Sequence, residues 1–326
     1  MKTVAFFDTK SYDLESFKKF ADEDINIRFF ENKLNADTVS MAACCDAVCA
    51  FVNDNIDKTV IEQLEKYGVG LIAMRCAGYN NVDLKAARGR VHIVRVPAYS
   101  PFAVAEHAIG MILMLNRKLH RAYIRTRDHN FSLEGLTGFD LNGKTVGIIG
   151  TGKIGRSFAE ICRGFGMNIL GYDPYPSDDF CGKNVELKEL LTESDIISLH
   201  CPLTKENLYL INEETLKEMK NGVFIINTSR GQLIDTSALI SGLKSGKVGA
   251  AGLDVYEEET ALFFEDYSDE IIQDDTLSTL ISMPNVIVTS HQAFLTKEAL
   301  NSIAETTMNN LKDFFAGKDL ENEIVI

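Results

Sequence analysis

The sequence predicts an α/β protein made of two doubly wound parallel-sheet domains. Short apolar stretches of strand length alternate with amphipathic, helix-like stretches in both halves of the chain, which is the pattern of parallel sheets covered by helices. In the second half, one apolar stretch runs directly into a glycine-rich turn that opens a helix, Gly150-Thr-Gly-Lys-Ile-Gly155. The length of 326 residues leaves room for two domains of ordinary size.

The first hundred residues carry apolar stretches with the composition of buried strands. We predict these strands at 4–7, 25–30, 47–52, 69–74 and 93–96, with helices at 13–20 and 57–67. Regular alternation of this kind predicts a parallel sheet. We therefore expect a small α/β domain here, and it lacks the glycine fingerprint of the second half.

The second half begins with a strongly apolar helix and continues as a second α/β unit. We predict the helix at 103–119, six strands at 146–149, 168–173, 196–202, 223–229, 249–255 and 286–289, and further helices at 154–165, 185–191, 213–219 and 239–243. Six strands with intervening helices fit a dinucleotide-binding fold. The acidic stretch 256–280 is interpreted mostly as a solvated surface excursion, and a last helix at 297–315 is expected to return to the first domain.

The three glycines of the turn have separate roles in such a fold. Gly150 allows the tight turn, Gly152 lets a pyrophosphate approach the backbone, and Gly155 lets the helix pack closely on the strand. The start of that helix offers free N–H groups to phosphates. The glycine pattern alone is a weak signal, and its flanking strand and helix strengthen it.

Asp173 ends the next predicted strand, close to the roughly 20-residue spacing of a ribose-binding acid. Its carboxylate would accept hydrogen bonds from the adenosine ribose and repel a 2′-phosphate, so the sequence favours NAD over NADP. The alternative interpretation is an ordinary surface aspartate at the end of a strand.

Composition excludes several classes of protein. The net charge of −14 argues against a nucleic-acid partner, and no apolar run reaches the roughly 18 to 20 residues of a membrane span. Seven cysteines contain no Cys-x-x-Cys pair, so we expect neither a metal site nor a disulfide framework. The N-terminus fits a first buried strand better than a signal peptide, and we expect a cytoplasmic protein.

Two side chains that follow predicted strands suggest chemistry. Arg230 would present a guanidinium fork suited to a carboxylate. His291 could act as a general acid or base near neutral pH. Beside a dinucleotide site, they suggest hydride transfer to a small 2-oxo acid. The alternative is that both are ordinary polar side chains on solvent-exposed loops. We interpret His107, on the apolar helix, as a core or interface histidine rather than a catalytic one.

The chain resembles the D-isomer-specific 2-hydroxyacid dehydrogenase family over essentially its full length. The segments that carry the resemblance are Arg75-Cys-Ala-Gly-Tyr-Asn-Asn-Val-Asp83, Pro97-Ala-Tyr-Ser-Pro-Phe-Ala-Val-Ala-Glu-His107, Gly150-Thr-Gly-Lys-Ile-Gly155, Asn227-Thr-Ser-Arg-Gly231, Gly252-Leu-Asp-Val-Tyr-Glu257 and His291-Gln-Ala-Phe-Leu-Thr296. The insertion at 263–267 and the His-Gln-Ala-Phe ending resemble the lactate branch of the family. The implied reaction is the reversible reduction of pyruvate to D-lactate.

The resemblance also implies residue roles. Arg230 would bind and polarise the 2-oxo acid, and His291 would exchange a proton with its carbonyl oxygen. Glu259 would pair with His291, with Glu257 as the second candidate. The remaining substrate contacts would come from the backbone of Ala77 and Gly78 and from the side chains of Tyr99 and Phe294.

The implied NAD site is spread over the second domain. Its expected residues are Gly150, Gly152, Lys153, Ile154, Gly155, Asp173, Cys201, Pro202, Asn207, Thr228, Ser229, Arg230 and Asp254. The resemblance implies a discontinuous flavodoxin-like catalytic domain at 1–100 and 298–326, with a Rossmann NAD domain inserted at 101–297. It also implies a homo-oligomer, a dimer or tetramer.

The sequence leaves two other functions as alternatives. One is a dehydrogenase for larger 2-oxo acids such as phenylpyruvate or 2-oxoisocaproate, because the expected pocket could hold a larger side chain. The other is an NAD-sensing binding protein of the corepressor kind, which the charge and the complete set of catalytic residues disfavour.

Overall fold

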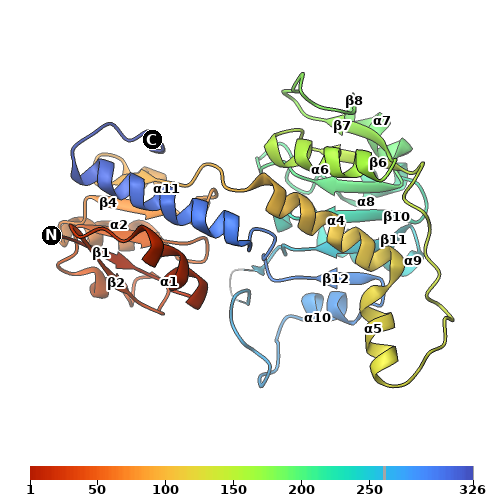
Figure 1. The fold of residues 1–326 in the computed structure, drawn as a ribbon, viewed down its shortest axis with the longest axis horizontal. Coiled ribbons are helices and arrows are strands. Elements are labelled where there is room, and N and C mark those ends of the chain that lie inside the picture. Colours follow the sequence, from red (N-terminus) through yellow and green to blue (C-terminus); the bar gives the residue numbers. More distant parts are fainter. Residues whose placement is uncertain (260–261, 326) are drawn as a thin grey trace. The chain divides into compact units, whose positions relative to one another are not determined.

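The computed structural model describes residues 1–259 and 262–325, which form two compact units. Unit 1 comprises residues 1–100 and 295–326, and unit 2 comprises residues 101–294 (Figure 1). The return to unit 1 falls at Leu295, slightly before the predicted residue 298.

Unit 1 is built on a five-stranded parallel sheet with strand order β2-β1-β3-β4-β5. The strands are β1 (Lys2–Phe6), β2 (Ile25–Phe29), β3 (Ala47–Ala50), β4 (Leu71–Met74) and β5 (His92–Val94). β3 and β4 are buried at every position, which explains their continuous apolar sequences. This strand order is the flavodoxin-like arrangement.

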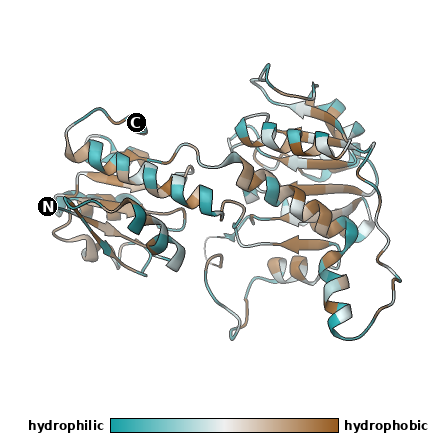
Figure 2. Cartoon of the chain, in the orientation of Figure 1, coloured by the Kyte–Doolittle hydropathy of each residue, from teal (hydrophilic) through white to brown (hydrophobic). Residues whose placement is uncertain are grey.

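The helices of unit 1 are α1 (Ser11–Phe17), α2 (Lys58–Lys66), α3 (Leu84–Ala87) and α11 (Lys297–Phe315). The last helix packs against α1 and β4, so the chain does return to the first sheet. Thr296 caps α11 by accepting a hydrogen bond from the N–H of Ala299. The helix alternates apolar and polar side chains (Figure 2), and its buried residues include Ile303, Met308 and Leu311.

Unit 2 is built on a seven-stranded parallel sheet with strand order β12-β11-β10-β9-β6-β7-β8. The strands are β6 (Thr145–Ile149), β7 (Asn168–Tyr172), β8 (Lys183–Asn184), β9 (Ile196–Leu199), β10 (Val223–Asn227), β11 (Val248–Leu253) and β12 (Val286–Val288). The prediction of six strands was therefore wrong by one. β8 is a two-residue edge strand whose side chains are polar and exposed, so no apolar pattern marks it.

The helices of unit 2 are α4 (Pro101–Arg117), α5 (Leu119–Arg127), α6 (Lys153–Gly164), α7 (Leu187–Glu193), α8 (Glu213–Glu218), α9 (Thr236–Ser245) and α10 (Asp275–Ser282). The apolar helix α4 packs against α6, β10 and β11, which explains its many apolar side chains. α10 lies in the stretch expected to be a surface excursion. It is capped by Asp274 and buries Leu277 and Leu280.

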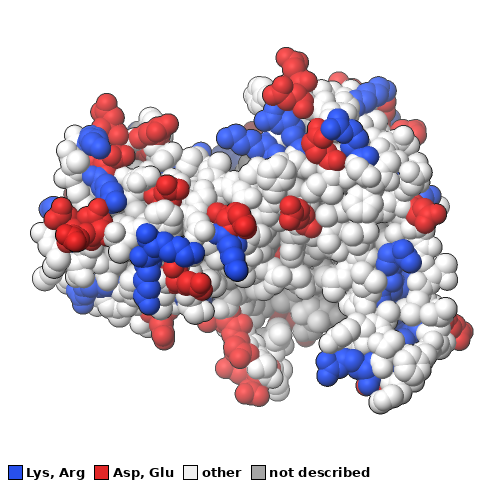
Figure 3. Space-filling view, in the orientation of Figure 1, with Lys and Arg blue, Asp and Glu red and all other residues white. Residues whose placement is uncertain are grey.

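The central strands of both sheets are strongly apolar (Figure 2). On the face of each unit drawn in Figure 3, acidic and basic side chains are interspersed. No helix in the part of the chain that the structure describes is both long and apolar enough to cross a membrane. The expected fold class, two doubly wound parallel-sheet domains, is confirmed by the two sheets.

Candidate active site

The glycine turn of unit 2 connects β6 to α6 and leaves no space for larger residues at two positions. Gly150 has a φ of +98°, and a Cβ there would lie 2.6 Å from the backbone nitrogen of Cys201. A Cβ on Gly155 would lie 2.0 Å from the carbonyl oxygen of Gly150. These contacts explain why the turn and the close approach of α6 require glycine.

Gly152, at the N-terminus of α6, is surrounded by open space. Among the described residues, and apart from its chain neighbours and the backbone of α6, no atom lies within 4 Å of the Cβ that this residue lacks, and no side chain caps the helix at this residue. The first N–H groups of a helix have no partner within the helix, and they favour anions. The turn therefore fits the pyrophosphate of a dinucleotide.

Asp173 follows β7 and is joined to the glycine turn. Its Oδ2 accepts a 2.8 Å hydrogen bond from the N–H of Thr151, and its Oδ1 accepts a 2.9 Å hydrogen bond from the N–H of Tyr175. A carboxylate has about four acceptor positions. The side chain is thus fixed beside the turn and keeps acceptors for the hydroxyls of a ribose.

Two buried hydroxyl oxygens at the same edge of the sheet have no hydrogen-bond partner among the residues that the structure describes. They belong to Thr151 in the glycine turn and Thr228 after β10. Buried polar groups are normally hydrogen-bonded, so these hydroxyls are suited to a bound polar molecule. Both observations agree with a cofactor at the carboxyl ends of these strands.

The segments after β9 and β10 are tied together. The hydroxyl of Ser229 donates to the carbonyl oxygen of Cys201. The side chain of Asn207 donates to the carbonyl oxygen of Pro202 at 2.8 Å. Burial raises the pKa of the Cys201 thiol to about 11, so this residue is a neutral thiol near neutral pH. The expected cofactor residues of these two segments thus lie close to one another.

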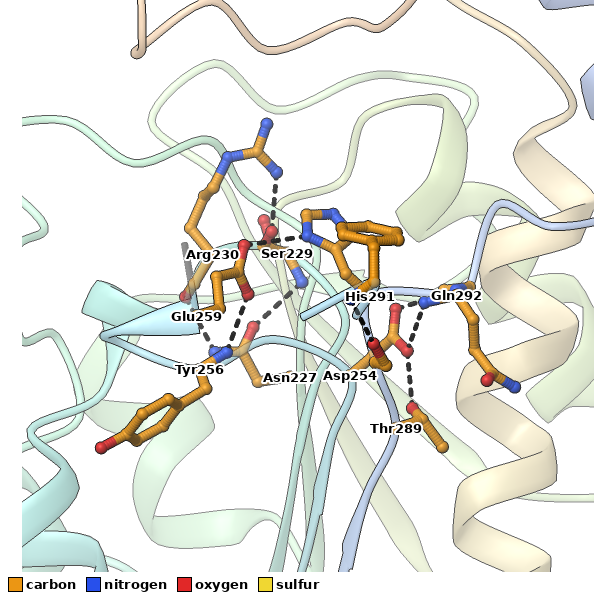
Figure 4. A network of polar contacts seen from close by, with 12 residues as sticks. Asn227, Ser229, Arg230, Asp254, Tyr256, Glu259, Thr289, His291 and Gln292 are labelled. Atoms are coloured by element: carbon orange, nitrogen blue, oxygen red, sulfur yellow. Dashed lines mark hydrogen bonds and ion pairs between the residues drawn. The ribbon is translucent and has the colours of Figure 1, made fainter. Parts of the chain in front are cut away.

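Arg230 is positioned by a tight loop that follows β10 (Figure 4). The side chain of Asn227 accepts from the N–H of Ser229 at 3.0 Å and donates to the carbonyl oxygen of Arg230 at 2.8 Å. A Cβ on Gly231 would lie 2.1 Å from the carbonyl carbon of Tyr256. Glycine at 231 therefore lets the Arg230 loop lie against the segment that leads to Glu259.

The guanidinium of Arg230 is half-buried and donates to the carbonyl oxygen of Ser229 at 2.7 Å. Arginine has five N–H donors in a planar fork. The other N–H donors of Arg230 can therefore form a bidentate contact with a carboxylate.

His291 is paired with Glu259. Nδ1 of His291 lies 2.9 Å from Oε1 of Glu259, and the two side chains are 19% and 18% exposed. Because a carboxylate only accepts, Nδ1 carries the proton in this pair. Oε2 of Glu259 accepts a 3.0 Å hydrogen bond from the N–H of Tyr256, which orients the carboxylate (Figure 4).

Glu257, the second candidate for this pairing, has other partners. Its carboxylate accepts a hydrogen bond from the hydroxyl of Tyr209 and another, of 2.9 Å, from the hydroxyl of Thr236. The carboxylate raises the pKa of the Tyr209 hydroxyl. The two glutamates of one turn thus have different partners, and Glu259 is the one bonded to the histidine.

Asp254, expected to contact the cofactor, is fully buried behind His291. Its two carboxylate oxygens accept hydrogen bonds from the N–H groups of Gln292 and Ala293 at 2.9 and 2.8 Å, and Oδ1 also accepts from the hydroxyl of Thr289. In this structure Asp254 therefore holds the turn that carries His291 (Figure 4). Its contact with a cofactor stays a prediction.

The expected substrate residues Ala77, Gly78 and Tyr99 belong to unit 1, whereas Phe294 is buried at the end of unit 2. Sequence reasoning missed a residue next to the first two. Nη1 of Arg95 donates to the carbonyl oxygen of Ala77 at 2.9 Å, and its guanidinium lies 5.2 Å from the centre of the Tyr79 ring. The available signal was that Arg95 is the charged residue within the predicted apolar stretch 93–96.

A dinucleotide-binding sheet whose edge also presents a guanidinium and a carboxylate-paired imidazole is the architecture of an NAD-dependent dehydrogenase. Comparison with known proteins agrees. The sequence model of the family "D-isomer specific 2-hydroxyacid dehydrogenase, NAD binding domain" matches residues 109–293. The chain belongs to the D-isomer-specific 2-hydroxyacid dehydrogenase family, as the sequence resemblance indicated.

Individual relatives match over nearly the whole chain. The D-lactate dehydrogenase of Escherichia coli is 53% identical and the 2-hydroxyacid dehydrogenase homolog of Haemophilus influenzae is also 53% identical, with 99% of each chain covered in both cases. The solved structure of a pyruvate reductase of Chlamydomonas reinhardtii is 44% identical with a TM-score of 0.93, covering 99% of this chain and 98% of that one. The protein is an NAD-dependent 2-hydroxyacid dehydrogenase.

Proposed function

We propose that this enzyme reduces pyruvate to D-lactate with NADH and catalyses the reverse reaction with NAD. The observation that carries the proposal is the pairing of His291 with Glu259 in the unit that also presents Arg230. The names of the relatives from Escherichia coli and Chlamydomonas reinhardtii support pyruvate and D-lactate as the substrate pair.

His291 is proposed as the general acid in reduction. Its Nδ1 proton is engaged with Glu259 at 2.9 Å, which leaves Nε2 as the ring nitrogen that exchanges a proton with the substrate oxygen. A carboxylate partner also stabilises the protonated ring. In the oxidation of D-lactate, the neutral ring takes the proton back.

Arg230 is proposed to bind the 2-oxo acid. A guanidinium can hold a carboxylate through two parallel hydrogen bonds, and its charge polarises an adjacent carbonyl group. NADH, when bound at the glycine turn, supplies the hydride that reduces the carbonyl carbon. Ala77, Gly78, Tyr99 and Phe294 are proposed as further substrate contacts, on the basis of the family resemblance.

The first experiment is NADH oxidation by the purified enzyme with pyruvate, followed by chiral analysis of the product. We expect D-lactate, formed at a rate on the order of 10 s⁻¹. L-lactate as the product would contradict the proposal. Slow turnover of pyruvate beside fast turnover of phenylpyruvate or 2-oxoisocaproate would establish the larger-substrate alternative. Binding of NADH without turnover of these acids would support the binding-protein alternative.

The homo-oligomer and the cytoplasmic location expected from the sequence are also proposals. Large apolar side chains are exposed along α5 and the segment after it, among them Tyr123, Phe131 and Leu133, and such a surface is typical of an interface. Light scattering coupled to size-exclusion chromatography would test this: a mass of a dimer or tetramer is expected, and a monomer at micromolar concentration would contradict the oligomer.

A further inference from the structure

A second histidine is connected by a chain of hydrogen bonds to the turn that carries the candidate catalytic histidine. His107, on α4, places Nε2 3.1 Å from Oγ1 of Thr289 and 3.4 Å from Oδ1 of Asp254. The side chain of His107 is 20% exposed and that of Asp254 is 0% exposed. Within the described residues, no lysine or arginine forms an ion pair with Asp254. His107 is therefore the positively chargeable partner that the structure gives to this buried acid.

The directions of these hydrogen bonds follow from the donors available. Although burial raises the pKa of Asp254, the nearby His107 and hydrogen bonds from Thr289 and Ala293 together hold this pKa below its usual value. The carboxylate is thus ionised and only accepts. The single hydroxyl hydrogen of Thr289 points to Asp254. Nε2 of His107 lies within reach of both acceptors, and the shorter distance, 3.1 Å against 3.4 Å, assigns its hydrogen bond to the hydroxyl oxygen of Thr289.

These hydrogen bonds connect His107 to the turn that carries His291. The carboxylate of Asp254 accepts from the N–H groups of Gln292 and Ala293, and the carbonyl oxygen of Asp254 accepts from the N–H of His291 at 2.7 Å. His291 has a φ of +48°, which is unfavourable for a residue with a side chain. Asp254 provides the contacts that keep the backbone in this conformation.

We propose that His107 is a positioning residue for His291, acting by donating a hydrogen bond to Thr289, which in turn donates to Asp254. This inference depends on the proposed catalytic role of His291. His107 does not touch the substrate or the cofactor in this scheme. Its donor keeps Thr289 and Asp254 in the arrangement that sets the direction of the catalytic imidazole.

Two substitutions at position 107 separate the donor from the volume of the side chain. His107→Leu removes the donor, whereas His107→Gln retains an N–H donor without a ring. We expect His107→Leu to lower kcat with pyruvate by roughly 10- to 100-fold, because small displacements of catalytic groups have effects of this order. His107→Gln should recover most of the loss, and the KM for NADH should stay within about twofold in both variants. His92→Leu, on an exposed histidine at the start of β5, is the control for loss of an imidazole.

A double-mutant cycle tests the route through Thr289. In the Thr289→Val background, His107→Leu should have little further effect, because the hydroxyl that it serves is absent. Equal losses in His107→Leu and His107→Gln, or effects that add in the cycle, would overturn the proposal. So would a lower melting temperature of His107→Leu with unchanged kcat, since that result indicates packing alone.

A measurement without turnover keeps this test independent of the proposed substrate. The ¹⁵N chemical shifts of the His291 ring report which nitrogen carries the proton, and His291→Asn assigns the signal. We expect a wild-type ring protonated at Nδ1 and a loss of this preference in His107→Leu but not in His107→Gln. Identical shifts in wild type and His107→Leu would refute the positioning role, whereas failure of pyruvate reduction by the wild type alone would refute only the proposed function.

Discussion

His291 and Glu259 are joined by a hydrogen bond of 2.9 Å between Nδ1 and Oε1, and the N–H of Tyr256 orients the other carboxylate oxygen. This pairing fixes the tautomer of the imidazole and its direction. Of the neighbouring glutamates of the turn, Glu259 is bonded to the proposed catalytic histidine, whereas Glu257 is bonded to Tyr209 and Thr236.

The first prediction compares these glutamates. Glu259→Gln should lower kcat for pyruvate reduction by about 10- to 100-fold, because it weakens general acid catalysis, worth about 10² to 10⁴ in rate, without removing the histidine. Glu257→Gln changes the same charge two positions earlier, so it is the matched control and should change kcat far less. Equal kinetic losses in both variants would contradict the assignment of Glu259.

The second prediction concerns Arg230. Arg230→Lys keeps the positive charge but loses the planar fork, so the KM for pyruvate should rise and kcat should fall, together by about 100-fold in kcat/KM. Arg163→Lys, on the surface of α6, is the control and should behave as wild type. Steady-state kinetics of the two variants at saturating NADH provide the measurement. Unchanged kcat/KM in Arg230→Lys would remove this residue from substrate binding.

The third prediction concerns the coenzyme. Asp173→Ala removes the acceptor for the N–H of Thr151 as well as the repulsion of a 2′-phosphate. The kcat/KM for NADH should fall by roughly 10- to 150-fold while that for NADPH rises, since one charge-assisted hydrogen bond contributes about 1.5 to 3 kcal/mol. Asp178→Ala, on an exposed residue nearby, controls for charge. An unaltered ratio between the two coenzymes would disprove the ribose contact.

The fourth prediction concerns Arg95 in unit 1. Its hydrogen bond to the carbonyl oxygen of Ala77 holds the backbone proposed to bind the substrate carboxylate. Arg95→Met keeps much of the apolar length of the side chain but loses the hydrogen bond to Ala77. The KM for pyruvate should therefore rise by about tenfold, with a smaller change in kcat. Arg90→Met, which removes a surface ion pair with Glu65, should leave the KM within about twofold. A normal KM in Arg95→Met would show that this loop is held by other contacts.

The fifth prediction concerns stability. Burial raises the pKa of Asp54 to about 6, despite the nearby Arg75 and the hydrogen bonds that its carboxylate accepts from the N–H groups of Phe51 and Leu34. The native state thus binds the proton more tightly than the unfolded chain, whose aspartate pKa is about 3.9. The contribution of Asp54 to the free energy of unfolding should therefore fall as the pH rises from about 4 to 6, by roughly 2 to 3 kcal/mol.

Asp54→Asn cannot titrate, so the difference in unfolding free energy between wild type and variant should change with pH over this window. Urea denaturation at several pH values measures the difference. Asp37→Asn, at an exposed position, controls for the general effect of charge. A difference that is constant from pH 4 to 7 would contradict the raised pKa.

Much of the fold was predictable because local patterns carry it. The buried strands are continuous apolar runs, and α11 was predicted with its observed bounds because its apolar residues recur with helical spacing. Two of the failures have a common physical cause. β8 is only two residues long and polar, and α10 is a short helix that follows a run of acids, so neither produces a strong hydrophobic period.

The sequence by itself determined the fold class, the glycine turn, and Arg230 and His291 as side chains that follow strands, because each depends on local periodicity or on fixed spacing within one segment. The tertiary structure alone decided that Glu259 rather than Glu257 meets His291, that Arg95 holds Ala77, and that His107 reaches Thr289. These relationships join residues far apart in the chain. They depend on where strand order and side-chain direction bring those residues together, which no local pattern of the sequence encodes.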